Sequence, residues 1–295
     1  MDLSPILGQI PNEVPRPLAI QRAPKFSTWQ FRPEDLAAQI TLIEHRNFTS
    51  IKMHEFHHQA WTSKLKTKLA PNLVNFIDFF NRIAYGVASE LVSEPKIKTR
   101  VTLLKRWIFV AHQCLKLRNY NTVFEIVAGL NMGCVSRLKK TWKALSKKYW
   151  DVWEMLNHVV SNEGSYRWYR SQIAEVVRSN STGGIPCVPY LGVNLSDLTF
   201  AEDGNPTFAK PSVALEAEPL AKVAGAAPPP TPIVNFNKFR FISQLINKIE
   251  FMQRYEYTLP PDPKIQDFIL HEWGNLTEAE LYTASKVCEP RIAGT

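Results

Sequence analysis

The sequence predicts an all-α protein that folds as a single irregular helical domain. Glycine is scarce, at 12 of 295 residues, whereas leucine, alanine, lysine and glutamate are plentiful, which favours helices. Apolar residues recur at three- and four-residue steps over long segments, the spacing of one face of a helix. One large domain or two ordinary ones would fit the length, which is enough for a substantial core, and no internal repeat is evident.

The first 26 residues differ from the rest of the chain. They contain five prolines and no amphipathic period, which predicts an extended leader over residues 1–26. Helical character begins at Pro33, which suits a first helical turn. Glu34 and Asp35 beside it suit the positive end of a helix dipole. The first helix is therefore predicted over residues 33–45.

Single residues mark the ends and contacts of the later helices. Asn72 can cap the helix that follows it, and Gly129 would let a second helix approach closely. Asn131 closes a turn between two helices, where a C-cap is one interpretation. The apolar spacing predicts helices over residues 70–92, 96–117, 119–131, 135–142, 150–158, 166–177, 263–273 and 277–286.

Residues 54–58 match HExxH, a pattern in which two imidazoles on one helical face bind zinc and the glutamate acts as a general base. A zinc hydrolase of this kind needs a third ligand, and the remaining histidines have no recognisable spacing for one. The helix here would also be short. We therefore expect no metal and no other cofactor.

Prolines and a stop signal frame the segment IPCVPYLGVNLSDLTFAEDGNP at residues 185–206. Pro186 and Pro189 cannot lie inside a helix, so a helix can begin only at about Pro189. The Gly-Asn-Pro triplet at 204–206 then ends it with residues that tolerate left-handed backbone, followed by a breaker. The last turn carries one large apolar residue, Phe200, and two carboxylates. On the residues alone, this is typical of an amphipathic helix with a solvated acidic end.

The composition argues against several functional classes. The four cysteines are widely separated with no CxxC pair, which argues against a disulfide framework and favours a reduced intracellular setting. No run approaches the roughly 18 apolar residues that a membrane span requires. The formal charge of +8 includes a dense basic run at 137–148, interpreted first as a solvated face and second as weak attraction to anionic lipid headgroups. Nucleic acid ranks third, and no nucleic-acid partner is expected.

The segment 185–206 resembles the helical-hairpin signature of the Ras-family guanine nucleotide exchange factors, the Son-of-sevenless-like RasGEF domain. That signature reads P-P-x-[IV]-P-[YF]-L-G-x-Y-L-T-D-L-x-F-[IE]-E-E-G-N-P, and its second arm, I-N-F-S-K-x-R, is similar to IVNFNKFR at 233–240. Glu55 and Trp61 match structural positions of the same family. Further matches follow in order: LAAQITL at 36–42, APN at 70–72, RLKKTW at 137–142 and EPR at 289–291.

The resemblance implies an all-α fold with a single irregular helical domain over residues 27–292 and a protruding helical hairpin at about 186–255. An Ala/Pro-rich stretch at 209–232 is longer than the usual connection and is expected to be a flexible insertion. Such an insertion need not destabilise the hairpin, because chain entropy grows slowly with loop length.

The resemblance also implies a function, exchange of guanine nucleotide on a Ras-, Rap- or Ral-like small GTPase. This needs no nucleophile, acid–base pair or cofactor, so the protein is not expected to be an enzyme with covalent chemistry. The hairpin would act as a wedge that opens switch I and blocks the Mg²⁺ and phosphate positions. Thr199 falls at the position that faces Mg²⁺, with Phe200 assisting. Asp203 falls at the acidic wedge position, where the usual Glu would reach further.

A second patch is implied to grip switch II of the GTPase. Asp78 stands where some relatives carry a basic contact residue, and Asn205 matches an asparagine that contacts switch I. For the apolar residues of this second patch, ordinary core packing stays open as an alternative. The residues implied to bind the GTPase are Ile77, Asp78, Phe124, Asn131, Tyr166, Tyr190, Leu195, Ser196 and Asn205.

The expected partner is a Ras-superfamily GTPase in its nucleotide-free form. The expected localisation is cytoplasmic with recruitment to membranes, where contact would be peripheral or made through the GTPase. The alternative from a different class is a helical scaffold that binds a GTPase or another signalling partner without accelerating exchange. Loss of the upstream helical domain that often braces this hairpin in the family would favour that alternative.

Overall fold

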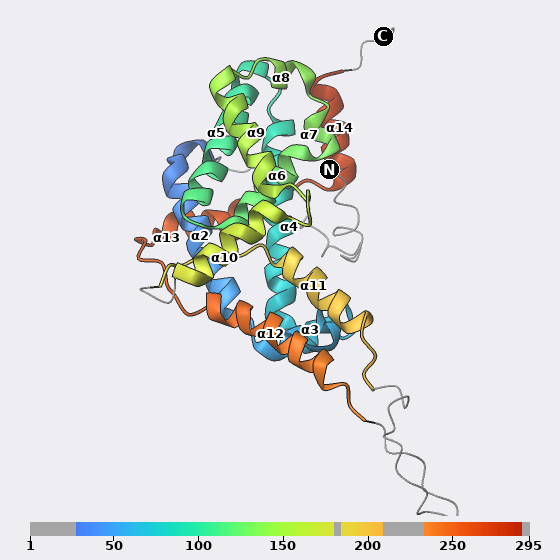
Figure 1. Cartoon of the computed structure of the whole chain (residues 1–295). Helices are drawn as coiled ribbons and strands as arrows, with labels where there is room; N and C mark the ends of the chain where they lie inside the picture. The colour runs from blue at the N-terminus through green and yellow to red at the C-terminus, as the bar shows by residue number, and fades with distance from the viewer. Residues whose placement is uncertain (1–27, 180–183, 209–232, 291–295) are drawn as a thin grey trace, which may run out of the picture.

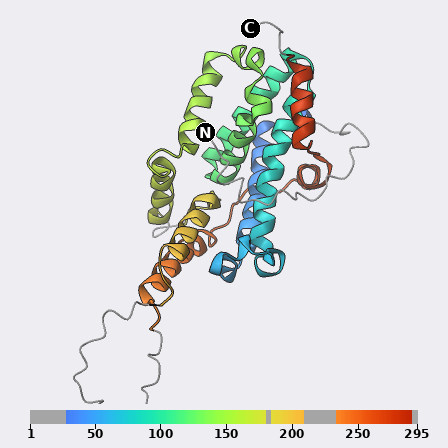
Figure 2. The ribbon, with the colours of Figure 1, turned by 90° about the vertical axis from the view of Figure 1, so that its right-hand side faces the viewer.

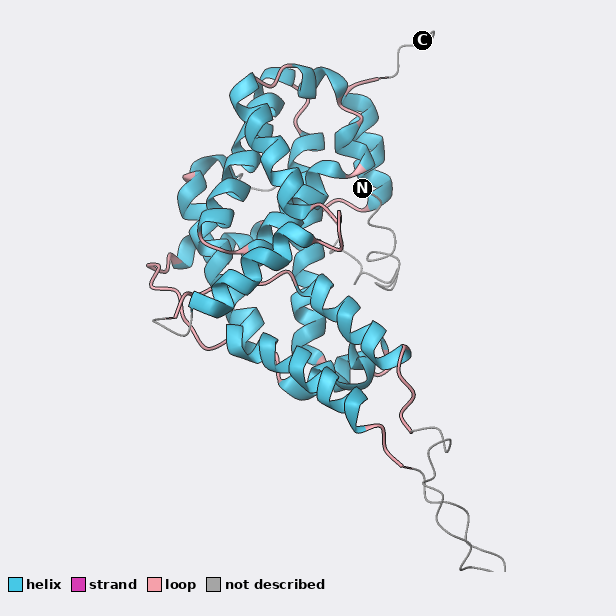
Figure 3. Ribbon diagram, in the orientation of Figure 1, coloured by secondary structure: helices cyan, strands magenta, loops and turns pink. Residues whose placement is uncertain are grey.

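The computed structural model describes residues 28–179, 184–208 and 233–290, and in these ranges the chain is helical with no strand, as Figure 3 shows. Two isolated β-bridges, Asn119–Val188 and Phe208–Val234, are the only ladder contacts recorded there. The all-α prediction is confirmed. The expected leader at 1–26 and insertion at 209–232 lie outside the described residues.

The helices match the predicted segments in order. The first are η1 (Thr28–Gln30), α2 (Pro33–Ser50), η2 (Met53–Thr62), α3 (Lys66–Leu69), α4 (Pro71–Ser93), α5 (Ile97–Lys116), α6 (Tyr120–Asn131), α7 (Gly133–Ser136) and α8 (Lys139–Lys143). The rest are α9 (Lys147–Val160), α10 (Arg167–Ser179), α11 (Leu191–Asp203), α12 (Phe236–Met252), α13 (Pro263–Asp267), the π-turn η4 (Phe268–Glu272) and α14 (Glu278–Cys288).

The main core forms where α4, α5 and α6 meet (Figure 1). Trp107 and Ile108 of α5 and Val127 of α6 are fully buried in it. Gly129 lies at the α4–α6 contact, where an added Cβ would come within 2.4 Å of the carbonyl oxygen of Ala84. The close approach predicted for Gly129 is thus present, because only glycine fits this distance.

A buried polar contact joins α2 to α6. The Asn121 Nδ2 donates to Glu44 Oε2 at 2.7 Å and to Glu125 Oε1 at 2.8 Å. Burial raises the pKa of Glu44 to about 7, and burial next to Glu44 raises the pKa of Glu125 well above its ordinary value. Two buried carboxyl groups next to each other repel when both are charged, so the Glu44–Glu125 pair holds a proton near neutral pH.

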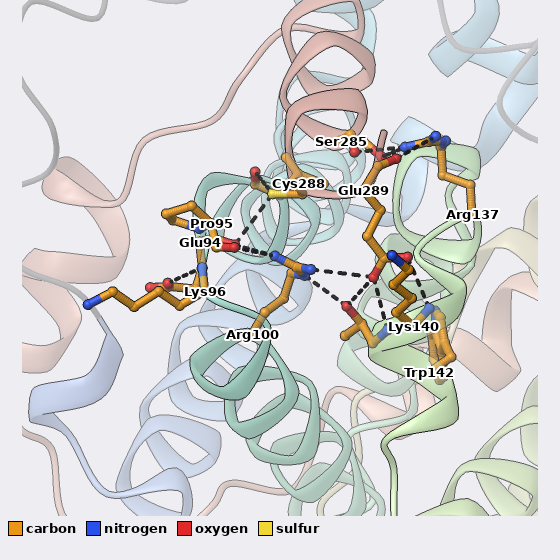
Figure 4. A network of polar contacts seen from close by, with 12 residues as sticks. Glu94, Pro95, Lys96, Arg100, Arg137, Lys140, Trp142, Ser285, Cys288 and Glu289 are labelled. Carbon is orange, nitrogen blue, oxygen red and sulfur yellow. Dashed lines mark hydrogen bonds and ion pairs between the residues drawn. The ribbon is translucent and has the colours of Figure 1, made fainter. Parts of the chain in front are cut away.

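The C-terminal helix is fixed by the network in Figure 4. Arg100 of α5 pairs with Glu289 at 3.3 Å, and both side chains are buried. Glu289 also accepts hydrogen bonds from the backbone amides of Lys140 and Thr141 at 3.0 and 2.9 Å. Because these bonds join α5, α8 and the end of α14, they close the end of the molecule that lies away from α11 and α12 (Figure 1).

A second, smaller core lies between the two hairpin helices, α11 and α12, and the helices α2 and α4 of the body. It joins Phe48 of α2 and Phe76 of α4 to Leu198 of α11 and to Ile246 and Ile249 of α12. The two hairpin helices are therefore held to the body by a separate apolar cluster, which includes residues from the N-terminal half of α4.

Candidate functional site

Helices α11 and α12 lie side by side and project from the body, as Figures 1 and 2 show. Helix α11 runs outward and ends at Asp203, and α12 returns from Phe236. The backbone N–H of Asn235 donates to the carbonyl of Thr207 at 2.9 Å, which ties the two arms together near the tip. The predicted helical hairpin is present, although α11 begins two residues later than Pro189.

Short polar side chains finish both arms at the tip. Asn205 Nδ2 donates to the carbonyl of Ala201 at 3.0 Å and so satisfies one of the last carbonyls of α11. The Asn235 side chain accepts from the N–H of Lys238 and caps α12. Gly204 follows the last residue of α11, as expected, and its φ of −77° is right-handed. The left-handed backbone that glycine tolerates is not used at this position.

The three residues that the sequence predicts to form the wedge, Thr199, Phe200 and Asp203, occupy the last turns of α11. Phe200 is 73% exposed, although it is a large apolar side chain. Thr199 is half-buried, and its hydroxyl donates to the carbonyl of Leu195 at 2.9 Å. Asp203 is exposed, and its Oδ1 accepts a hydrogen bond from Gln59 Nε2 at 2.7 Å. The tip therefore presents the exposed ring of Phe200 next to a carboxylate that is held in place, and the rings of Phe208 and Phe236 nearby are exposed as well.

The partner of that carboxylate lies in η2. His58 and Gln59 both have left-handed backbone, with φ of 51° and 52°, a conformation that is costly for residues other than glycine. This turn brings the Gln59 amide to Asp203 and places His58 Nδ1 3.4 Å from Glu202 Oε1. The loop thus braces the outer end of α11 from the body of the protein.

A buried lysine braces the same turn from the second arm. Lys238 of α12 has its Nζ 2.9 Å from the carbonyl oxygen of Glu202 and 3.4 Å from Glu202 Oε1. Sequence reasoning assigned no role to Gln59 or Lys238. For Lys238 a signal existed, because the quoted pattern I-N-F-S-K-x-R has its lysine at this position. Nothing in the sequence pointed to Gln59.

The second predicted patch is partly buried. Phe124 of α6 and Tyr190 stack at a centroid distance of 3.8 Å and an interplanar angle of 9°, and each is only 4% exposed. Tyr169 donates its hydroxyl hydrogen to the Tyr190 carbonyl at 3.2 Å. Tyr166 is half-buried, with its ring 6.1 Å from that of Phe124, and burial raises its pKa. Phe124 and Tyr190 are thus core residues in this structure, and Tyr166 closes over them.

The other predicted contact residues are spread over three places. Ile77 of α4 and Leu195 of α11 are half-buried against the second core. Asp78 and Ser196 are exposed one residue further along, and desolvation raises the pKa of Asp78 while the charge of Lys66 opposes it.

Asn131 is exposed at the end of α6. Its Nδ2 donates to Asn157 Oδ1 of α9 at 3.2 Å, and Met132 is the C-cap residue. The side chain of Asn131 therefore does not act as a C-cap.

The HExxH segment is not a zincin helix. It lies in η2, and a break in helical geometry at His57 and His58 separates the two potential imidazole ligands. Glu55 is buried and accepts hydrogen bonds from Lys52, Asn72 and Leu73. Among the residues with described coordinates, no group of three His, Cys, Asp or Glu side chains could hold a metal ion.

Comparison with known proteins agrees with the geometry of the hairpin. The sequence model of the RasGEF domain matches residues 35–240, which is most of the chain. The chain belongs to the RasGEF domain family. Relatives include the Ras guanine nucleotide exchange factors M and K of Dictyostelium discoideum, each 35% identical over 89% and 98% of this chain. The Ras-specific guanine nucleotide-releasing factor 1 of Mus musculus is 33% identical over 88% of it.

The match covers only part of each relative. The chain spans 26%, 17% and 18% of the lengths of factor M, factor K and the mouse releasing factor. In this RasGEF domain the matched residues extend from α2 to the start of α12, so they include the whole first arm of the hairpin and the beginning of the second. No helix in the described part of the domain is long and apolar enough to cross a membrane.

Proposed function

We propose that this RasGEF domain is a guanine nucleotide exchange factor for a Ras-, Rap- or Ral-like small GTPase. The observation that carries the proposal is the projecting hairpin, whose tip exposes Phe200 beside the carboxylates of Glu202 and Asp203. The names of the relatives, all Ras exchange or releasing factors, support it.

The activity would come from differential binding rather than from covalent chemistry. A GTPase holds its nucleotide through phosphate-binding groups and Mg²⁺. A protein that binds the nucleotide-free form more tightly than the loaded form lowers the affinity for nucleotide by the same factor. The nucleotide-free GTPase is therefore the partner that the hairpin should stabilise, and no nucleophile, general base or cofactor is needed.

Each tip residue has a role in this proposal. Phe200 supplies exposed apolar bulk that can exclude water from the Mg²⁺ site, and Thr199 faces the same site. Asp203 competes for the groups that bind phosphate. Because Asp203 is shorter than glutamate and already accepts a hydrogen bond from Gln59, we expect it to exchange that bond for a donor on the GTPase. Asn205, at the foot of the tip, would contact switch I.

The second patch would hold switch II. Its accessible members are Tyr166, Asn131 and Ser196, while the stacked Phe124 and Tyr190 would form its floor. Ile77 and Leu195, each half-buried, would add apolar contact at the edge of the second core. Aromatic anchors with polar neighbours are typical of interface hot spots. Asp78 would influence which GTPase is accepted.

The limits and surroundings of the domain are also proposals. Residues 27–292 would form the catalytic unit and 186–255 the hairpin. The partner would be the GTPase and not a nucleic acid. The protein would act in the cytoplasm, with membrane contact that is peripheral or made through the GTPase.

Release of fluorescent nucleotide from a panel of loaded Ras, Rap and Ral proteins tests the proposal. We expect at least one member to release nucleotide faster when the RasGEF domain is added. The alternative function, a scaffold, predicts that a GTPase binds the domain while its release rate stays at the intrinsic value in the whole panel.

A further inference from the structure

Exposed lysines gather at the end of the molecule opposite the hairpin tip. They come from the start of α5, from α8 and from the start of α9, and α8 lies far from the tip of α11 in Figures 1 and 2. The hydrogen bond from Arg100 Nε to Thr141 Oγ1, 2.8 Å long, holds α5 against α8. This lysine face consists of Lys96, Lys98, Lys139, Lys140, Lys143, Lys147 and Lys148, all exposed.

The charge of the lysine face is only partly neutralised from within, by the half-buried Glu94, whose carboxylate accepts from the backbone N–H of Lys96 at 2.8 Å. None of the seven lysines takes part in an ion pair recorded for the described ranges. Glu289, which follows α14, is buried. Its carboxylate oxygens accept hydrogen bonds from Arg100, from the Thr141 hydroxyl and from the backbone amide of Lys140, so they are not available to the exposed lysines. Figure 4 shows Lys96 and Lys140 on either side of the Arg100–Glu289 pair. The nearest exposed acids along α9, Asp151 and Glu154, leave a clear positive excess.

The exposed cations are lysines, which favours a ligand whose negative charge is spread over a surface. The two arginines at this end are turned inward, since Arg100 donates to the carbonyl of Glu94 at 2.7 Å and Arg137 donates to the carbonyl of Ser285 at 2.7 Å. The exposed charge is therefore all lysine, a point charge without the planar fork that reads base edges and pairs with single phosphates. Trp142 is buried, so it offers no face on which a base could stack.

An apolar residue lies among the lysines. Ile97, between Lys96 and Lys98, is 39% exposed. Point charges around a small apolar contact suit a surface whose negative charge is spread over many headgroups. We propose that the lysine face docks this protein peripherally on a bilayer that contains anionic phospholipid. This surface is separate from the hairpin and acts whether or not the domain catalyses exchange.

Vesicle co-sedimentation tests the lysine face. The whole chain is mixed with vesicles of phosphatidylcholine alone or of phosphatidylcholine with phosphatidylserine. We expect binding only to the second, and a steep loss as salt is added, because screening weakens surface charge. Each lysine near the surface raises the partition coefficient roughly fivefold. The variant Lys139→Glu, Lys143→Glu, Lys147→Glu should therefore lose on the order of 100-fold or more.

A matched variant separates position from net charge. Lys116→Glu, Lys248→Glu, Lys264→Glu changes three exposed lysines on α5, α12 and α13 and alters the net charge equally. It should keep most of the binding. Replacing Lys139, Lys143 and Lys147 by glutamine gives a second variant if charge reversal disturbs folding, which circular dichroism checks. It should show a smaller loss.

Three results would overturn the proposal. The first is that the chain does not bind vesicles with phosphatidylserine. The second is that the two charge-reversal variants lose binding equally. In the third, an oligonucleotide duplex would bind the lysine face more tightly than the vesicles at the same ionic strength. Nucleotide release in solution without vesicles should be the same for the variant of Lys139, Lys143 and Lys147 as for the unaltered chain, so failure here is distinguishable from failure of the exchange function.

Discussion

Glu55 illustrates how one side chain can satisfy two readings of a sequence. Its HExxH context suggests a general base, whereas its oxygens accept from the N–H groups of Lys52, Asn72 and Leu73 at 2.9, 2.8 and 3.0 Å. Two of these donors are the first amides of α4, which have no partner inside their helix. Asn72, expected to cap α4, instead donates its own Nδ2 to Glu55. The cap comes from 17 residues earlier, which local sequence rules cannot anticipate.

Glu55→Ala should destabilise the fold by about 2 to 3 kcal/mol, because it leaves buried amides unpaired. Burial alone would raise the pKa of Glu55, but hydrogen bonds from Lys52, Leu73 and Asn72 outweigh it and lower that pKa below 4.5. The stabilisation is therefore present above about pH 4.5 and is lost as the pH falls through the lowered value. Urea unfolding at several pH values measures it.

The exposed His54 provides the control for Glu55. His54→Ala should change the free energy of unfolding by no more than about 0.5 kcal/mol. An equal loss in both variants would point to a shared role, such as a metal site, instead of a helix cap.

Phe200 and Asp203 are exposed, so their replacement should affect exchange more than stability. Phe200→Ala and Asp203→Lys should each slow nucleotide release by about tenfold or more, as for hot-spot residues. They should change the free energy of unfolding by about 0.5 kcal/mol or less. Stopped-flow release and thermal melts give the two values.

Exposed residues far from the tip serve as matched controls. Tyr282→Ala on α14 removes an exposed ring, and Asp151→Lys on α9 reverses an exposed charge. Both should leave release unchanged. Normal exchange in the two tip variants would show that the wedge residues are assigned wrongly.

At the scale of the element, the hairpin could be predicted as two helices but not as a braced unit. Proline and glycine placement fixed where α11 could lie, and the family pattern supplied the second arm. The left-handed turn at His58 and Gln59, which holds the tip, depends on contacts across more than a hundred residues of sequence. No local propensity predicts two consecutive left-handed residues that are not glycine. The second core, between the hairpin and helices α2 and α4, likewise depends on contacts between residues that are distant in sequence.

Lys238→Met should loosen the outer end of the hairpin. The buried Nζ contacts the backbone carbonyl and the side chain of Glu202, and methionine keeps the apolar length without the charge. Hydrogen exchange in the last turn of α11 should accelerate by about tenfold, which corresponds to roughly 1.4 kcal/mol. Lys248→Met, an exposed position on the same helix, should leave the hydrogen-exchange rates of the last turn of α11 unchanged. Equal protection in both variants would show that Lys238 does not brace the tip.

At the scale of the whole molecule, helix content and order followed from periodicity, since each helix must bury an apolar face. Gly129 was foreseen because a glycine inside a helical pattern signals close packing. The gathering of lysines from α5, α8 and α9 at one end could not be foreseen, because residues 96–98 and 139–148 are distant in sequence. The burial of Phe124 and Tyr190 likewise depends on how α6 meets the segment before α11.

The fold places the hairpin at one end and the lysine face at the other, so the proposed exchange activity and the proposed lipid attachment should be separable. Lysine-face variants and tip variants should act independently in a double-mutant test, since the sites share no partners.

Binding to a responsive GTPase, with and without nucleotide, tests the central claim most directly. Titration calorimetry should show tighter binding to the nucleotide-free GTPase than to the GDP-loaded form, with GDP affinity lowered in the complex by the same factor. Equal affinity for the two forms would contradict the account, because a protein without that difference cannot displace nucleotide.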